Sequence, residues 1–320
     1  MEMSGDAVDL SVVIAAYDAA DTLPDQLEAL AAQRTTCRWE VVLADNGSHD
    51  GTVAAALAFS DRLPVLRVVD ASSRRGAGAA RNAGARVARG RSLVLCDADD
   101  VVADGWLEAM HQALLRSPFV AGRLDAERLN PPAVVASRVL PQTTGLQPSK
   151  LLPGLWHAGA GNMGIRADVF RQVGGFDEVA PSLEDTDLCW RVGLHGMPLE
   201  FVPDALVHVR LRSGLRATVR QGYQYGIGER WLMQRFADVA AARATPSDAG
   251  TDAPAAAGRA GRIAHRGARL VALGAEVVRV RDRGRLNALC WSTAWRAGFS
   301  LGLSPAPVSM LSVPGGPHGH

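Results

Sequence analysis

Short apolar runs alternate with stretches of helical spacing along the first hundred residues of this 320-residue chain. The runs have the length of buried strands, and the stretches between them repeat apolar residues every three or four positions. Strands that alternate with helices form a parallel sheet covered by helices on its faces. The sequence therefore predicts an α/β fold with a mostly parallel sheet, with strands at 10–16, 39–44, 65–69 and 92–96 and helices at 22–33, 52–59 and 78–88.

Polar clusters follow three of these four strands, at the point where each strand ends. In open α/β sheets, ligands bind in the crevice outside the carboxyl ends of the strands. We therefore expect one binding crevice to be lined by Tyr17-Asp18, Asp45-Asn46-Gly47 and Asp97-Ala98-Asp99-Asp100.

Two carboxylates, Asp97 and Asp99, stand two residues apart directly after the strand at 92–96. Mg²⁺ typically takes one or two carboxylates together with substrate phosphates, so this pair predicts a site for a divalent cation. The alternative is a polar turn that caps the following helix, with Asp100 or Asp104 as the capping residue. The pattern by itself is compatible with both.

A second acidic cluster, Glu184-Asp185-x-Asp187, opens a helix predicted at 183–195. Acidic residues in a first helical turn are stabilised by the helix dipole, which is one interpretation. The other is that one carboxylate serves as a general base, taking a proton from a hydroxyl nucleophile near a metal-bound phosphate ester.

Mixed elements are predicted between residues 106 and 210. A helix at 106–115 and a strand at 120–124 precede a Pro-rich, weakly patterned stretch that ends near 153. A short helix at 168–173 follows, and after the helix at 183–195 we expect a pair of strands at 199–202 and 205–209.

Six segments stand in the order seen in family 2 glycosyltransferases, and together they resemble that family across residues 10–210. They are SVVIAAYD (11–18), DNGSHDGT (45–52), RGAGAARNAG (75–84), LCDADD (95–100), GGFDE (174–178) and EDTDLCWR (184–191). The resemblance implies a GT-A (Rossmann-like) fold, a nucleotide-diphosphate-sugar donor, a divalent cation, Mg²⁺ or Mn²⁺, and an inverting mechanism.

The resemblance also implies roles for single residues. On the donor side, it implies that Ala15, Tyr17 and Asp18 line the nucleotide pocket, that Asp45 accepts a hydrogen bond from the base, and that Arg81 lies near the nucleotide or its phosphates. The first segment departs from the family's usual Pro-x-Tyr-Asn pattern, which leaves the base preference open.

On the metal and acceptor side, the resemblance implies that Asp97 faces the ribose or the metal and that Asp99 binds the metal. Asp185 would be the catalytic base and Glu184 its support. His208 would be a further metal or phosphate contact, although a single His on a strand is equally compatible with a structural role.

Other functions fit the residues less well. A dinucleotide fingerprint would need Gly where Arg81 stands. A sugar nucleotidyltransferase would need a basic, Gly-rich loop after the first strand, where residues 15–22 have neither Gly nor a basic residue. A sugar-nucleotide-binding protein without glycosyl transfer is the remaining alternative, and retention of Asp97, Asp99 and Asp185 argues against it.

The overall charge of +1 hides an uneven distribution. Up to His208 the chain has 18 basic and 27 acidic residues, whereas from Val209 onward it has 16 basic and 6 acidic residues. A basic segment on an acidic body suggests an interaction surface. We expect an anionic membrane or a phosphate-bearing, lipid-linked acceptor to bind residues 210–300, because basic amphipathic helices with aromatic residues are attracted to such surfaces. Nucleic acid is not expected, since no recognition motif is present.

The predicted organisation follows from these patterns. A catalytic domain at 10–210 has a nucleotide-sugar half (10–105) and an acceptor half (106–210). The remaining parts are a flexible N-terminus (1–9), a basic amphipathic helix (211–242), a linker (243–261), a helical hairpin (262–303) and a disordered tail (304–320). Four scattered cysteines, an acidic N-terminus and the lack of a long apolar run favour a cytoplasmic protein, peripheral at the inner face of the membrane.

Overall fold

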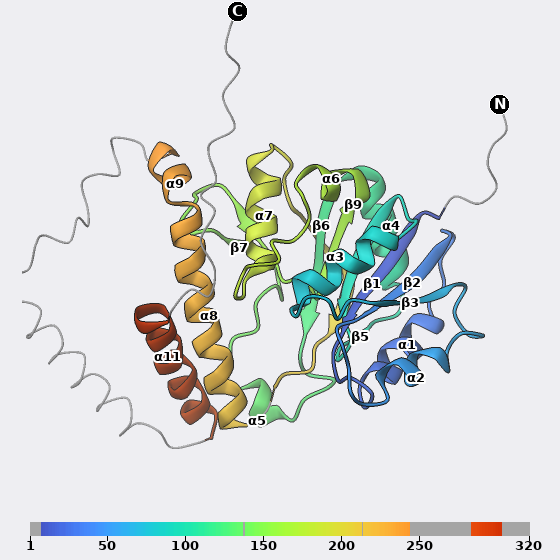
Figure 1. Ribbon diagram of the computed structural model, residues 1–320, viewed down its shortest axis with the longest axis horizontal. Coiled ribbons are helices and arrows are strands. Elements are labelled where there is room, and N and C mark those ends of the chain that lie inside the picture. Colours follow the sequence, from blue (N-terminus) through green and yellow to red (C-terminus); the bar gives the residue numbers. More distant parts are fainter. Residues whose placement is uncertain (1–7, 137, 213, 244–282, 303–320) are drawn as a thin grey trace, which may run out of the picture. The chain divides into compact units, whose positions relative to one another are not determined.

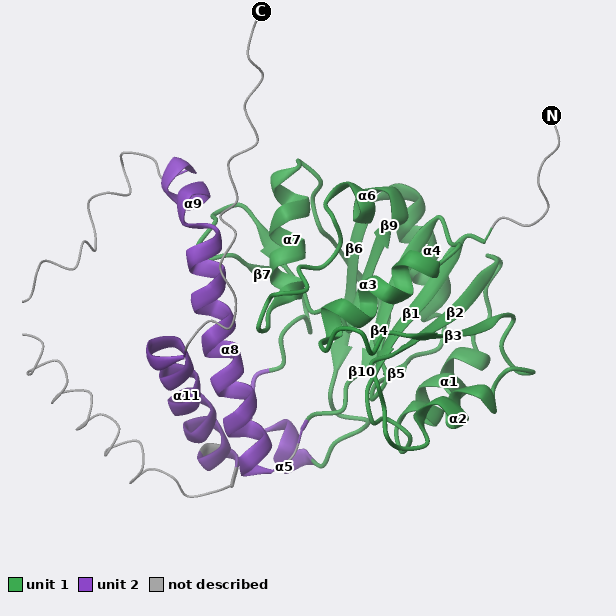
Figure 2. Ribbon diagram, viewed as in Figure 1, with its two compact units in different colours: residues 1–131, 140–211 green, residues 132–139, 212–320 purple. Residues whose placement is uncertain are grey.

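The computed structural model describes residues 8–136, 138–212, 214–243 and 283–302. Two compact units divide the chain between them, as Figure 2 shows. Unit 1 comprises residues 1–131 and 140–211, and unit 2 comprises 132–139 and 212–320. Most of the predicted N-terminus, the linker, the first helix of the hairpin and the tail lie outside the described residues.

Unit 1 is built on an eight-stranded sheet with the order β3-β2-β1-β4-β9-β6-β10-β5, and helices surround it (Figure 1). A separate two-stranded sheet pairs β7 with β8. The strands are β1 (Leu10–Ala16), β2 (Trp39–Asp45), β3 (Leu66–Asp70), β4 (Ser92–Asp97), β5 (Val101–Val102), β6 (Phe119–Asp125), β7 (Gln147–Pro148), β8 (Trp156–His157), β9 (Asn162–Arg166) and β10 (Glu200–His208).

The block formed by β3, β2, β1 and β4 is parallel throughout, as the alternating pattern predicts. Strands that helices cover on both faces have nearly continuous apolar sequences. Val12, Val13 and Ile14 of β1 and Val41 and Val42 of β2 are accordingly fully buried. The common register brings Ala16 beside Asp45 and Ala15 beside Asp97, so the polar clusters that follow these strands meet at one edge.

Strand β9 was not predicted, and it makes the sheet mixed because it pairs antiparallel with both β4 and β6. A buried side chain, Asn162, fixes this strand. Its carboxamide donates to the main-chain oxygens of Arg123 and Ala205 (both 2.8 Å) and accepts from Trp106 Nε1 (2.9 Å). These partners lie 39, 43 and 56 residues away. Local periodicity therefore carries little signal for β9.

The strand pair predicted at 199–202 and 205–209 is wrong. One strand, β10, runs through both segments and pairs parallel with β6, with a shift of register between Val202 and Leu206. Pro203 lies at this irregularity, and a bulge is one of the few places where a strand accommodates a residue without an N–H group. The proline interrupts the pairing register and leaves the strand direction unchanged.

The helices of unit 1 agree with the predicted helices to within a few residues at each end. They are α1 (Leu23–Ala31), α2 (Thr52–Leu57), α3 (Ala77–Val87), α4 (Trp106–Arg116), α6 (Ala167–Gln172) and α7 (Glu184–Leu194).

Unit 2 contains α5 (Pro132–Val135), α8 (Leu215–Arg235), α9 (Ala237–Arg243) and α11 (Arg283–Leu301). Helices α8 and α11 approach so closely that a Cβ at Gly222 would lie 2.5 Å from the main-chain oxygen of Trp291. Gly226 and Gly298 face main-chain oxygens of the opposite helix in the same way. Small residues at such positions allow two helix backbones to come together. Within the described residues, we find no helix with the length and apolar character needed to span a membrane.

Candidate functional site

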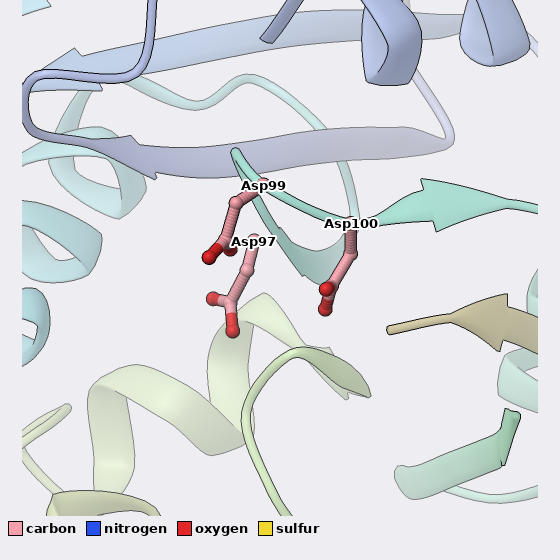
Figure 3. A group of neighbouring side chains, drawn as sticks. All are labelled: Asp97, Asp99 and Asp100. Atoms are coloured by element: carbon pink, nitrogen blue, oxygen red, sulfur yellow. The ribbon is translucent and has the colours of Figure 1, made fainter. Parts of the chain in front are cut away.

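An acidic turn joins β4 to β5 and carries Asp97, Asp99 and Asp100, whose side chains extend from the same short segment (Figure 3). One carboxylate oxygen of each residue lies within 4.8 Å of the others. Hard divalent cations such as Mg²⁺ prefer carboxylate oxygens, so the donor set fits such a cation. Asp97 and Asp99 were predicted as ligands, and the structure adds Asp100 to the group.

Asp100 is nearly fully buried, and burial raises its pKa to about 8, with the negative charges of Asp97 and Asp99 adding to the effect. The N–H group of Arg210 donates to Asp100 Oδ1 (2.8 Å) and partly opposes this shift. The alternative that Asp100 or Asp104 caps the next helix is wrong. Helix α4 has Gly105 at its N-cap, and no side chain caps it.

Two residues outside the acidic turn hold its main chain. The fully buried Gln26 of α1 donates from Nε2 to the Asp97 oxygen (3.1 Å) and accepts the Val102 N–H group at Oε1 (2.9 Å). Arg210 donates from Nε to the Asp99 oxygen (3.1 Å) and from Nη2 to Asp25 (3.1 Å). Gln26 was not predicted as a site residue, and Arg210 was predicted to belong to the basic segment. A polar residue among the apolar positions of helix 22–33 was the available signal for Gln26.

Arg81 of α3 connects the two acidic clusters. The residue is 5% exposed, and its guanidinium binds Asp97 Oδ1 (2.7 Å) and Glu184 Oε1 (2.9 Å). The guanidinium also lies over the Phe176 ring, 5.6 Å from its centroid. The next residue, Asn82, exchanges hydrogen bonds with the main chain of Phe176 (both 2.9 Å). The Arg-Asn motif therefore joins β4, the Gly-Gly-Phe-Asp turn and the start of α7.

Asp185 lies in the first turn of α7. Its Oδ1 accepts the Thr186 N–H group (2.7 Å), and its Oδ2 accepts the Ala160 N–H group (3.4 Å). Burial raises its pKa to about 6, the charge of Glu184 adds to the rise, and the hydrogen bonds and Arg81 oppose it. A carboxyl group with a pKa near 6 is suited to exchange protons near neutral pH.

The residues predicted to line the nucleotide pocket lie at the ends of β1 and β2 and in the loops that follow, and these two loops are hydrogen-bonded together. Asp18, with a positive φ of 47°, accepts the His49 N–H group (2.7 Å), and its own N–H group donates to Ser48 Oγ (3.0 Å). Asp45 at the end of β2 accepts the Ser48 N–H group (3.3 Å). Tyr17 is 47% exposed, and its ring lies under the guanidinium of Arg75. Ala15 occupies the position on β1 that is paired with Asp97.

His208 ends β10, and its Nδ1 lies 2.8 Å from Asp125 Oδ2. Burial is the largest single influence and acts to raise the pKa of Asp125, but the hydrogen bond with His208 and those from the main chain at Glu127 and Arg128 together outweigh it, so the pKa is lowered. In the antiparallel pairing of β10 with β5, His208 lies opposite Val101, the residue that follows the acidic turn. Within the described residues, the acidic group that could hold a cation consists of Asp97, Asp99 and Asp100 and does not include His208.

Two solved structures superimpose on this chain over most of its length. A mannosyltransferase from Pyrobaculum calidifontis, solved with GDP-Man and Mn²⁺, superimposes with a TM-score of 0.58 at 18% identity, covering 92% of this chain and 88% of the other. S. aureus TarS 1-349, solved with UDP-GlcNAc, gives a TM-score of 0.53 at 15% identity, covering 91% of each chain. The fold is therefore that of the GT-A glycosyltransferases.

The family models place the chain within this class. The model described as Glycosyl transferase family 2 matches residues 11–174, and that described as Glycosyl transferase family group 2 matches residues 144–311. The chain belongs to glycosyl transferase family 2, as its six motifs predicted.

Curated relatives match over part of their length. Succinoglycan biosynthesis protein ExoO from Rhizobium meliloti is 40% identical over 102 residues, which are 32% of this chain and 28% of that protein. Glycosyltransferase AglE from Haloferax volcanii is 27% identical over 198 residues, 62% of this chain and 65% of that protein. The chain thus spans less than two thirds of the length of either relative.

Proposed function

We propose that this protein is an inverting glycosyltransferase that moves a sugar from a nucleotide-diphosphate donor to an acceptor hydroxyl. One observation carries the proposal: Arg81 binds both Asp97 of the acidic turn and Glu184 beside Asp185. This arrangement links a set of carboxylates suited to a cation to the start of α7, where the pKa of Asp185 is raised. Leaving-group stabilisation and proton removal are the two tasks that such a transfer requires.

On the donor side, Asp97 and Asp99, with Asp100, would hold Mg²⁺ or Mn²⁺. A divalent cation at this position supplies Lewis-acid stabilisation for the negative charge that develops on the departing diphosphate. Ala15, Tyr17 and Asp18 would line the nucleoside pocket, with Asp45 accepting a hydrogen bond from the base. The exposure of Tyr17 and the hydrogen bonds between the two loops support this assignment.

On the acceptor side, Asp185 would be the base and Glu184 would support it through Arg81. The acceptor oxygen attacks the anomeric carbon while the bond from that carbon to the phosphate oxygen breaks. The nucleoside diphosphate leaves with the bonding electron pair, and the acceptor proton goes to Asp185. Attack opposite the leaving group inverts the sugar carbon. The acceptor would be a polysaccharide such as a cell-envelope polymer, a lipid-linked sugar or a small molecule.

Two substitutions separate these tasks. We expect Asp185→Asn to retain donor binding, measured as thermal stabilisation by a sugar nucleotide with Mn²⁺, and to lose release of nucleoside diphosphate. We expect Asp99→Ala to lose the Mn²⁺-dependent stabilisation itself. Asp61→Asn, at an exposed carboxylate, is the matched control. Full turnover by Asp185→Asn would reject the base, and no release from any UDP- or GDP-sugar by the wild type would reject the transfer.

We also propose that unit 2 binds the cytoplasmic face of an anionic membrane and brings a lipid-linked acceptor to the enzyme. Helix α8 exposes Arg216 and Arg220 one turn apart, together with the apolar side chains of Val219 and Tyr223. Basic and aromatic side chains on one helix favour an anionic lipid surface.

The membrane proposal is tested with the full chain and vesicles. Arg216→Glu with Arg220→Glu should weaken binding to phosphatidylglycerol-containing vesicles, measured by co-sedimentation, by about 30-fold or more, because each of the two basic residues contributes about 1 kcal/mol near the surface. Arg62→Glu with Arg86→Glu changes the charge equally at exposed positions in unit 1 and is the control. Equal binding by both double variants would refute the proposal.

A further inference from the structure

Gln142 has an unusual backbone in the weakly patterned stretch between α5 and β7. Its φ is +61°, a left-handed conformation that a non-glycine residue rarely adopts, yet the residue is only 3% exposed. Such conformations persist where the surroundings hold them, and they concentrate at functional sites. The hydrogen bonds of Gln142 show what holds it.

The side chain of Gln142 uses both ends of its carboxamide. Nε2 donates to the main-chain oxygens of Gly122 in β6 (2.7 Å) and Asn162 in β9 (3.4 Å). Oε1 accepts the N–H group of Gly159 (2.9 Å), and the main-chain oxygen of Gln142 accepts the Leu124 N–H group (3.0 Å). Gln142 therefore ties residue 159 to two strands of the sheet.

The loop of residues 159–161 lies between the two acidic clusters. The N–H group of Ala160 donates to Asp185 Oδ2. A Cβ at Gly161 would lie 2.7 Å from Asp97 Oδ2, so the loop backbone passes directly against that carboxylate. A Cβ at Gly159 would lie 3.8 Å from Asp185 Oδ2 and 3.9 Å from Gln142 Oε1. The position of this loop thus sets what both carboxylates contact.

We propose that Gln142 is a positioning residue for sugar transfer: it fixes the loop of residues 159–161, which in turn orients Asp185 for proton removal from the acceptor. The inference rests on the proposed function of Asp185. The side chain of Gln142 binds main-chain groups and neither of the two carboxylates, so it acts through the main chain of Gly159 and Ala160.

Two variants test the proposal: one removes the hydrogen bonds of the side chain, and the other shortens the side chain. Gln142→Met keeps the length of the side chain and removes its hydrogen bonds. Gln142→Asn keeps the carboxamide and tolerates the left-handed backbone, but it is one methylene too short to reach Gly159. Gln172→Met, at the exposed end of α6, is the matched control.

The assay measures nucleoside diphosphate released from UDP-GlcNAc or GDP-mannose with Mn²⁺, with water as the acceptor. We expect kcat to fall on the order of 10- to 100-fold in both Gln142 variants, because small misplacements of a catalytic group have effects of this size. The donor KM and the thermal stabilisation by donor should change less than twofold. Gln172→Met should match the wild type.

The pH profile gives a readout that loss of stability alone would not move. Asp185 faces Glu184 and Cys189 on its own helix, Arg81 on α3 and the Ala160 N–H group on the loop. Loss of the Ala160 hydrogen bond would remove an interaction that favours the carboxylate. The acidic limb of the kcat profile should therefore move to higher pH in both Gln142 variants.

Hydrogen exchange tests the same inference without activity. The Gly159 amide should exchange at least tenfold faster in Gln142→Met, whereas the amides of α7 keep their protection. Variants that fold and keep wild-type kcat, or a donor KM that rises as kcat falls, would overturn the proposal. Release of no nucleoside diphosphate by the wild type would instead reject the proposed function, and unchanged Gly159 exchange would then reject the positioning role separately.

Discussion

Replacement of Arg81 by Met tests how the two acidic clusters are held together. The guanidinium is almost completely buried and forms ion pairs with Asp97 (2.7 Å) and Glu184 (2.9 Å). Met fills much of the same space but leaves both carboxylates without their positive partner. Removal of one partner from a buried ion pair costs about 3–5 kcal/mol in folding free energy.

The exposure of the two carboxylates reduces that figure. The side chain of Asp97 is 36% exposed and that of Glu184 is 19% exposed, so water can solvate part of each charge. We therefore expect Arg81→Met to lower the free energy of unfolding by about 2–3 kcal/mol at pH 7. For a unit of this size, that loss corresponds to a fall in Tm of about 5–10 °C.

Thermal and urea unfolding, followed by circular dichroism, measure the effect. Arg86→Met on the same helix is the control, because its side chain is 64% exposed and its Nη1 lies 3.6 Å from Glu178. We expect that surface pair to contribute less than about 1 kcal/mol. Equal Tm values for both variants would refute this reasoning.

Three further outcomes are expected. The kcat of the wild type should fall as the pH drops through about 6, because Asp185 has a raised pKa and a protonated carboxyl cannot take the acceptor proton; a flat profile between pH 5 and 7 would contradict this. Gln26→Met should weaken Mn²⁺ binding, measured by calorimetry with nucleoside diphosphate, by about tenfold, because the main chain at Asp97 and Val102 loses both hydrogen bonds. The pKa of Glu108 is lowered to about 2 by hydrogen bonds from Thr35, Gln112 and Thr36. The ionised form therefore stabilises the fold above pH 4.5, and this contribution is lost as the pH falls toward 2. Urea unfolding should show Glu108→Gln about 1 kcal/mol less stable at pH 7, with the difference vanishing near pH 2.

The parallel half of the sheet could be predicted because its signals are local. Each of β1 to β4 is a nearly continuous apolar run that differs from the helical stretch beside it, so the pattern is visible within about ten residues. The same holds for the acidic turn, which follows a strand directly. The prediction that Tyr17, Asp45 and Asp97 share one edge required only that the strands be parallel.

The residues that support the acidic turn and the loop of residues 159–161 could not be predicted, because their contacts are with residues distant in the sequence. Gln26 lies 71 residues from Asp97, and Gln142 lies 17 to 20 residues from the main-chain groups that its side chain binds. A single glutamine in a helix or a loop has no periodicity that would distinguish it from an ordinary polar residue. What identifies both residues is burial with every hydrogen-bonding group of the carboxamide used, and burial of this kind is set by the tertiary fold.

Arg210 shows that the change from acidic to basic composition along the sequence does not coincide with the boundary of the candidate site in the fold. It belongs by sequence to the basic segment that begins at Val209, and its place in the structure is beside Asp99 and Asp100. The acidic turn concentrates three carboxylates within 4.8 Å, and such a group needs positive charge even before a cation binds. Arg81 supplies that charge to Asp97, and Arg210 supplies it on the other side of the turn. The first basic residue after His208 therefore belongs to unit 1 and contacts the acidic turn, whereas the basic residues from Arg212 onward belong to unit 2.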